Sequence, residues 1–225
     1  MKRYILLFLL LNFTDLKGQN PNPYGLQIIN DLNAYKEYVK ADSSKELLEL
    51  KKHIPGLKLD IRYASKNNFT GQAVYKQARA FARRPVTESL RNVQLELNKS
   101  GLGLKIFDAY RPYTVTRKFF EIASDKNFVA NPKDGSRHNR GCAIDLTLID
   151  LKTGKELAMP TPYDSFAPEA ASDFKDLPLD VIKNRDLLRT VMEKNNFRVL
   201  NNEWWHFDFI GWRNFELMDI PFEDL

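Results

Sequence analysis

Apolar positions along the chain follow helical spacing in some segments and alternate with polar positions in others. Helical spacing predicts helices over residues 41–54, 86–98, 112–123 and 179–195. Alternation or a short apolar run predicts strands over residues 57–63, 104–109, 143–149, 197–200 and 204–210. Because several of these strands are linked as hairpins, the pattern indicates an α+β fold, with one central antiparallel sheet flanked by helices in a single domain.

Polar and glycine residues mark the ends of the first two predicted helices. Ser43 or Ser44 can cap the first helix, because a hydroxyl accepts a hydrogen bond from a free backbone N–H. Thr87 can cap the second helix in the same way, and Gly101 can end it. The polar segment 131–140 is predicted to be a loop.

The composition is that of one globular domain. The chain has 225 residues, 43% of them hydrophobic, which is enough for a sizeable core and short for two domains. The formal charge of +5 is spread along the chain without a long Lys/Arg run, so we expect no nucleic-acid partner. The single cysteine, Cys142, cannot form an internal disulfide, so stability must come from the core.

The first residues have the pattern of a secretory signal. Lys2 and Arg3 precede a short apolar run, residues 5–11, which is far below the ~20 apolar residues of a spanning helix. A buried N-terminal helix or strand is the alternative. We expect a signal peptide over 1–18, although no clear small-residue pattern fixes the cleavage site near Gly18. The mature protein is then exported to the periplasm without stable membrane insertion.

The rest of the chain divides in two on this interpretation. Residues 19–40 are expected to form a flexible lead-in, and residues 41–225 the catalytic domain. The sequence does not indicate an oligomeric state.

Two histidines and an aspartate form a candidate metal site. His138 lies in the predicted loop, Asp145 on the strand that follows it, and His206 on the last predicted strand. Two imidazoles and one carboxylate are a common ligand set for catalytic zinc, with one position left for water, so one Zn²⁺ per chain is expected. The alternative is that both histidines are surface or hydrogen-bonded core residues, and spacing alone does not decide between these.

A glutamate and an arginine can complete a hydrolytic site. Glu203 can act as general base toward water, and Arg111, which follows a predicted strand, can face a developing oxyanion. Side chains alternate along a strand, so a regular strand would point Glu203 and His206 to opposite faces. Both can serve one site only if the backbone is irregular there, and we expect such a distortion.

The chain resembles the D-alanyl-D-alanine dipeptidases, the group of the vancomycin-resistance dipeptidase among the D-Ala-D-Ala metallopeptidases. The family pattern Ser-x-His-x-x-Gly-x-Ala-x-Asp matches residues 136–145, Glu-x-Trp-His matches 203–206 and Asp-x-Tyr-Arg-Pro matches 108–112. Residues 59–64, 68–71 and 161–166 also look like family segments. The resemblance extends from about Leu47 to His206 and implies the hedgehog-like fold of that group, with zinc at the sheet.

The resemblance also implies the role of each residue at a matching position. His138, Asp145 and His206 take the zinc positions, Glu203 that of the base and Arg111 that of the transition-state cation. Two further residues are implied to bind the substrate. Asp164 stands where the family pairs with the free ammonium group of a dipeptide, and Ser136 where it binds the other end.

The reaction expected from this resemblance is hydrolysis of D-Ala-D-Ala to free D-alanine. A D,D- or L,D-carboxypeptidase acting on peptidoglycan peptides is the alternative enzyme, and a non-catalytic zinc-binding module is a third possibility. Cys142 is expected to be a packed core thiol rather than a fourth ligand, and His53 to be structural. Asp108 is expected to hold the backbone or Arg111 in place.

Overall fold

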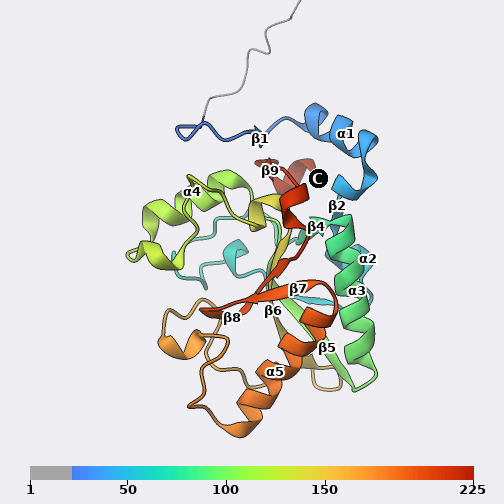
Figure 1. Ribbon diagram of the computed structural model, residues 1–225, viewed down its shortest axis with the longest axis vertical. Helices are drawn as coiled ribbons and strands as arrows, with labels where there is room; N and C mark the ends of the chain where they lie inside the picture. Colours follow the sequence, from blue (N-terminus) through green and yellow to red (C-terminus); the bar gives the residue numbers. More distant parts are fainter. Residues whose placement is uncertain (1–21) are drawn as a thin grey trace, which may run out of the picture.

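The structure is a computed structural model that describes residues 22–225, in which a five-stranded sheet forms the centre (Figure 1). The predicted signal peptide, 1–18, lies outside the described residues. The strand order is β3 (Lys58–Leu59), β5 (Leu102–Asp108), β6 (Ala143–Asp150), β8 (Glu203–Phe209) and β7 (Phe197–Leu200). Every neighbouring pair is antiparallel except β3 and β5, which are parallel. The predicted α+β fold with a central antiparallel sheet is confirmed, with the edge strand β3 as the exception.

Helices and loops cover both faces of this sheet. The two long helices, α3 (Arg84–Asn98) and α5 (Leu179–Lys194), pack against each other and against the sheet. In Figure 1, α4 (Tyr113–Ile122) lies across the central strands from α3. The residues of β6 from Ala143 to Ile149 are all buried, as expected for a central strand covered on both sides.

Two elements form within residues 28–40 of the expected flexible lead-in, so the expectation of a flexible segment is wrong for these two elements. Strand β1 (Ile28–Ile29) pairs in parallel with β9 (Leu217–Met218) near the other end of the chain. Helix α1 (Leu32–Ala41) follows, and the side chain of Asp31 caps it by accepting from the Ala34 N–H at 2.8 Å. The buried side chain of Tyr35 anchors this helix to the core.

The predicted helix over 41–54 is also wrong. Its apolar residues instead form β2 (Leu47–Glu49), which pairs with β4 (Phe81–Arg83), and a single turn, α2 (Leu50–His53), follows. A 3-10 turn, η1 (Ser43–Lys45), precedes β2, and Asp42 caps it rather than a serine. Leu47–Glu49 pair with a strand more than 30 residues away, and this pairing overrides the local helical pattern. The pairing is visible only in the folded chain.

The other predicted elements are confirmed, with small shifts at their ends. Helix α3 begins at Arg84 with a proline in its first turn, so Thr87 lies inside the helix and donates its hydroxyl to Ala82 O at 3.3 Å. The predicted strand over 57–63 is short because residues Arg62–Ala64 turn into a 3-10 helix, η2. The predicted loop over 131–140 ends in another 3-10 helix, η4 (His138–Arg140).

The C-terminal segment is packed against the loop that carries η4. Arg140 donates to Phe215 O, and the fully buried guanidinium of Arg83 donates to Arg140 O at 2.8 Å and to Glu216 O at 3.2 Å. The Tyr110 hydroxyl donates to Ile220 O at 2.9 Å. These bonds satisfy buried polar groups and fix the position of η4.

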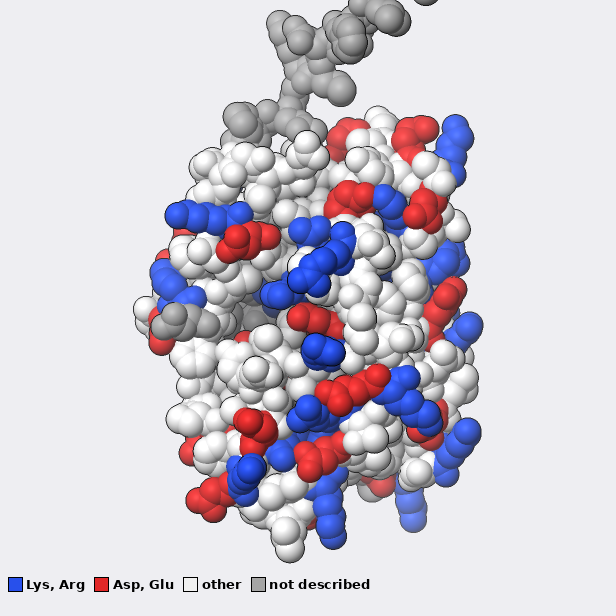
Figure 2. Space-filling model, in the orientation of Figure 1, with Lys and Arg blue, Asp and Glu red and all other residues white. Residues whose placement is uncertain are grey.

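The surface shows mixed charge. Lys and Arg side chains are interspersed with Asp and Glu over the face drawn in Figure 2. Within residues 22–225, no helix is both long enough and apolar enough to cross a membrane.

Gly141, directly after η4, provides a test of how tightly this loop is packed. Its φ is +68°, and a Cβ there would lie 2.6 Å from Leu47 Cδ2. Gly154 has a similar φ of +71° but open space around it. We expect Gly154→Ala to lower the free energy of unfolding by about 1–2 kcal/mol through backbone strain alone. Gly141→Ala should cost about 1–3 kcal/mol more through overpacking, measured by urea denaturation. Equal losses for the two variants would show that the loop is loosely packed.

Candidate active site

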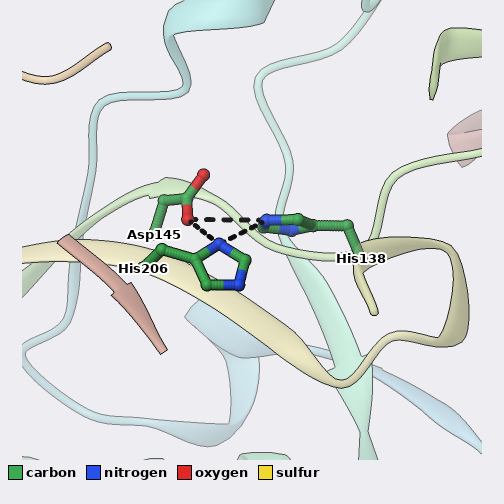
Figure 3. A group of neighbouring side chains, drawn as sticks. All are labelled: His138, Asp145 and His206. Atoms are coloured by element: carbon green, nitrogen blue, oxygen red, sulfur yellow. Dashed lines mark hydrogen bonds and ion pairs between the residues drawn. The ribbon is translucent and has the colours of Figure 1, made fainter. Parts of the chain in front are cut away.

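Three predicted metal ligands converge at one point of the sheet (Figure 3). Asp145 Oδ1 lies 3.0 Å from His206 Nδ1 and 3.4 Å from His138 Nε2, and the two histidine nitrogens are 3.2 Å apart. Four ligands at about 2.0–2.1 Å around a tetrahedral zinc ion lie roughly 3.3 Å from one another. The three atoms therefore already have the spacing of one face of such a tetrahedron.

The pairing of β6 with β8 produces two of these ligands. Asp145 is directly opposite His206 in the antiparallel register, so both side chains lie on the same face of the sheet. His138 comes from η4, and its carbonyl accepts from the Arg111 N–H at 3.1 Å. All three side chains are buried.

Each ligand side chain is also held through its other polar atom. His138 Nδ1 donates to Ala109 O at 2.7 Å, and His206 Nε2 donates to Asp208 Oδ1 at 3.0 Å. Asp145 Oδ2 accepts from the Tyr163 hydroxyl at 2.9 Å. These bonds select the histidine tautomers that leave His138 Nε2 and His206 Nδ1 free to ligate a metal ion.

Asp208 and Tyr163 were missed by the sequence reasoning. Asp208 is two residues after His206 on a predicted strand, so strand alternation alone would have placed both on the same face. Tyr163 lies in a loop, and neither spacing nor periodicity indicated a contact with Asp145.

The strand that carries Glu203 is irregular, as predicted. Val199 pairs with Phe207 on β8, whereas the next residue, Leu200, pairs with Glu203, so three residues of β8 have no partner on β7. This bulge brings Glu203 Oε2 to 3.9 Å from His206 Nδ1, on the same side of the sheet. Burial raises the pKa of Glu203, and the neighbouring histidine His206 opposes that rise.

Arg111 is fixed by a buried carboxylate. Its Nε and Nη2 donate to Asp108 Oδ2 at 2.9 and 2.7 Å, which confirms the expectation for Asp108. Its guanidinium lies 4.8 Å from the ring centre of Phe119 and 5.4 Å from that of Tyr63. Burial alone would lower the pKa of Arg111, but Asp108 holds that pKa well above its usual value, so the cation is permanent.

Asp164 has one carboxylate oxygen in use and one buried without a partner. Its Oδ1 accepts from the Tyr63 hydroxyl at 3.0 Å, whereas Oδ2 has no hydrogen-bond partner among the described residues. Burial, and then the charge of Asp145, raise the pKa of Asp164 to about 8. The residue also has a φ of +62°, which is uncommon for a non-glycine residue and costs conformational energy. An unpaired oxygen on a strained residue is suited to a cationic group supplied by a ligand.

One cavity of about 290 Å³ joins these groups. Its lining includes the predicted site residues Arg111, Ser136, His138, Asp145, Asp164, Glu203 and His206. Six aromatic residues also line it: Tyr63, Phe69, Phe119, Phe128, Phe166 and Trp205. The volume is near the lower end for small-molecule sites, which favours a small ligand.

The two residues expected to be structural lie outside this cavity lining. Cys142 is fully buried, and burial raises the pKa of its thiol to about 12, which suits a packed core thiol. His53 is exposed at the end of α2, where its Nδ1 is 3.0 Å from Glu49 O. Ser136 lines the cavity, and its Oγ accepts from the His138 N–H at 3.2 Å.

Comparisons with known proteins find a family of dipeptidases. A family model described as D-Ala-D-Ala dipeptidase, of the M15 peptidases, matches residues 43–217. The D-alanyl-D-alanine dipeptidase of Escherichia coli K12 is 34% identical over 163 residues, which cover 72% of this chain and 84% of that protein. The dipeptidase of Enterococcus faecalis V583 is 30% identical over 200 residues, covering 79% and 94%.

One solved structure that resembles this chain is that of the vancomycin-resistance D,D-dipeptidase VanXYg in complex with a D-Ala-D-Ala phosphinate analogue. The match covers 74% of this chain and 67% of the VanXYg chain, with 17% sequence identity and a TM-score of 0.38. That overlap is partial, and the assignment rests on the sequence matches. A match to well over half of the chain, with relatives similar over most of their length, shows that the chain belongs to the D-Ala-D-Ala dipeptidase family of metallopeptidases.

Proposed function

We propose that this protein is a zinc-dependent dipeptidase that hydrolyses D-Ala-D-Ala to two molecules of D-alanine. The observation that carries the proposal is that a three-ligand cluster, Glu203, Arg111 and the unpaired oxygen of Asp164 all line one small cavity. Family membership supports the reaction type, and the names of the relatives support the substrate.

The cluster fits a zinc ion by its donor set and its spacing. Two imidazole nitrogens and one carboxylate oxygen lie 3.0–3.4 Å apart, and each ligand is oriented by a second hydrogen bond. With three protein ligands, one position stays open for water or substrate. When bound, zinc supplies Lewis-acid polarisation of the scissile carbonyl and lowers the pKa of a water molecule to about 7.

The side chains around the cluster carry the proton transfer and the charge stabilisation. Glu203 accepts the proton of the attacking water and delivers it to the leaving amine nitrogen. Its pKa, raised by burial, suits a group that must both accept and release a proton near neutral pH. Arg111, held by Asp108 and two aromatic rings, stabilises the negative charge that develops on the carbonyl oxygen.

Asp164 restricts the reaction to short substrates. Its free Oδ2 pairs with the ammonium group of the dipeptide, and this cation favours the ionised carboxylate over the protonated form that burial favours. A longer peptide has an amide at this depth and leaves the carboxylate unpaired, which costs binding energy. Ser136 contacts the other end of the substrate. This arrangement favours a dipeptidase over a carboxypeptidase, and the presence of Glu203 and Arg111 favours an enzyme over a zinc-stabilised binding module.

The substrate assignment is tested with a matched pair of peptides. Zinc-loaded protein should release D-alanine from D-Ala-D-Ala but not from the same dipeptide with an acylated N-terminus, because acylation removes the ammonium group that pairs with Asp164. Free D-alanine is measured over time for both. Hydrolysis of the acylated peptide alone would contradict the dipeptidase proposal and support a carboxypeptidase.

The ligand and base assignments are separated by three histidine and glutamate variants. His206→Ala should lose both zinc and activity, since a ligand is removed. Glu203→Gln should keep zinc but lower kcat by roughly 10²–10⁴-fold, the usual contribution of a general base. His53→Ala, a histidine outside the cavity, should keep both. Zinc is measured by atomic spectroscopy on purified protein. Full activity in Glu203→Gln would refute the base assignment.

We also propose that the protein is exported to the periplasm, which Lys2, Arg3 and the apolar run that follows support. An exported dipeptidase meets dipeptide released from the cell wall, which favours a role in wall turnover or D-alanine recovery. Sequencing the N-terminus of the mature protein from fractionated cells should show a periplasmic chain that begins near residue 19. An intact Met1 in the cytoplasm would contradict export.

A further inference from the structure

Arg137 is the second arginine of the active-site cavity, and the catalytic groups leave it unused. It lies between Ser136 and His138 in sequence, and it lines the same cavity as both of them. Arg111, the other arginine in the lining, is nearly buried and donates twice to Asp108. Arg137 is open to solvent, with 46% of its side chain exposed.

The donors of Arg137 are largely free. Its one ion pair within residues 22–225 joins Nε to Asp208 Oδ2 at 3.5 Å, and no hydrogen bond from its guanidinium is found there. Asp208 is already engaged by His206 Nε2 at 3.0 Å. A guanidinium carries five N–H donors in a planar fork, so Arg137 can receive an anionic group with two parallel hydrogen bonds.

The position of Arg137 is nevertheless defined. Its carbonyl accepts from the N–H groups of Arg140 and Cys142 at 3.1 and 3.0 Å, which fixes the backbone. Its guanidinium lies 4.9 Å from the ring centre of Trp212, in the 3-10 helix η6 (Trp212–Asn214), so the side chain rests on an aromatic surface. A guanidinium held in this way loses little conformational entropy when it binds a ligand.

The charges of the cavity lining match a zwitterion. Asp164 offers a carboxylate oxygen without a partner, and Arg137 offers its two Nη groups, for which no acceptor is found within residues 22–225. Glu203 and Arg111 already have roles in the proposed reaction, as the general base and as the cation that stabilises the oxyanion. A free dipeptide carries one ammonium group and one carboxylate, and its carboxylate needs a cation once Asp164 holds its ammonium group.

We propose that Arg137 is a specificity-determining residue that binds the α-carboxylate of the dipeptide beside Ser136. This inference rests on the proposed function, since it assigns the second end of the same substrate. Asp164 and Arg137 then select for both charged ends at once. A dipeptide whose C-terminal carboxylate is blocked as an amide forfeits the interaction with Arg137.

The test compares D-Ala-D-Ala with its C-terminal amide in four zinc-loaded proteins: wild type, Arg137→Gln, Arg137→Lys and Arg213→Gln. Arg213 is the matched control, because it is exposed, stacks on the same Trp212 ring at 4.3 Å and is absent from the cavity lining. Free D-alanine is measured to obtain kcat and KM for each substrate, and zinc content is measured for each protein.

We expect Arg137→Gln to raise the KM for D-Ala-D-Ala roughly 10–100-fold, the worth of a hydrogen-bonded pair of charges, with kcat and zinc content little changed. Its kcat/KM for the amide should equal that of wild type, because that substrate never used the guanidinium. Arg137→Lys should recover part of the loss, since it keeps the charge but not the fork. Arg213→Gln should match wild type on both substrates.

Three results would overturn the inference while leaving the proposed function in place. Equal losses on dipeptide and amide, with lower zinc content, would show that Arg137 acts only through Asp208 and His206. An unchanged KM in Arg137→Gln would show that it has no role. Equal use of amide and dipeptide by wild type would show that the carboxylate is not recognised. If wild type hydrolyses neither substrate, the proposed function fails and the inference fails with it.

Discussion

The alternation of side chains along a strand is the constraint on which this active site depends. A regular β8 would send Glu203 and His206 to opposite faces of the sheet. The structure resolves the conflict by using the two sides of β8 differently. Toward β6 the pairing is regular from Ala143 to Asp145, which sets two metal ligands face to face. Toward β7, a bulge absorbs three residues and brings Glu203 round to the ligands. The bulge lies between β8 and the edge strand β7, so no strand beyond β7 is displaced by it.

The charges gathered around this point are kept in place by neutral donors. The tyrosine hydroxyls of Tyr63, Tyr75 and Tyr163 donate to Asp164, Asp108 and Asp145 at 2.8–3.0 Å. Burial raises the pKa of all three tyrosines well above the usual value, so each remains a donor at any working pH. A set of carboxylates in a low-dielectric site is tolerated only when each has such partners. These donors hold the carboxylates of the site in fixed positions, which lowers the reorganisation needed for catalysis.

The sequence predicted most of the site and much of the fold, and the failures have identifiable causes. Spacing alone left hydrogen-bonded core histidines as an alternative, and the family resemblance implied that His138, Asp145 and His206 act together. The structure places their ligand atoms within 4.8 Å of one another. The residues that orient them were missed, since Tyr163 makes its contact from a loop. Leu47 and Leu48 fitted a helix as well as a strand, and only their pairing with Arg83 and Ala82 decides for the strand. Short apolar runs of this kind stay ambiguous without knowledge of their partner.

The contacts of the C-terminal segment limit how far the chain can be shortened without damage to the active site. Arg140 precedes Gly141, and the Arg83 N–H donates to Gly141 O at 3.0 Å. The side chains of these two arginines donate to the carbonyls of Phe215 and Glu216, and the hydroxyl of Tyr110 donates to Ile220 O. The metal-ligand loop is therefore completed by residues that follow all of the ligands in the chain. A chain that stopped before residue 215 would carry His138, Asp145 and His206 but lack the carbonyl groups that hold η4. The three ligands are therefore not sufficient for the site, and loss of the C-terminal segment should loosen η4 and weaken metal binding without removing a ligand.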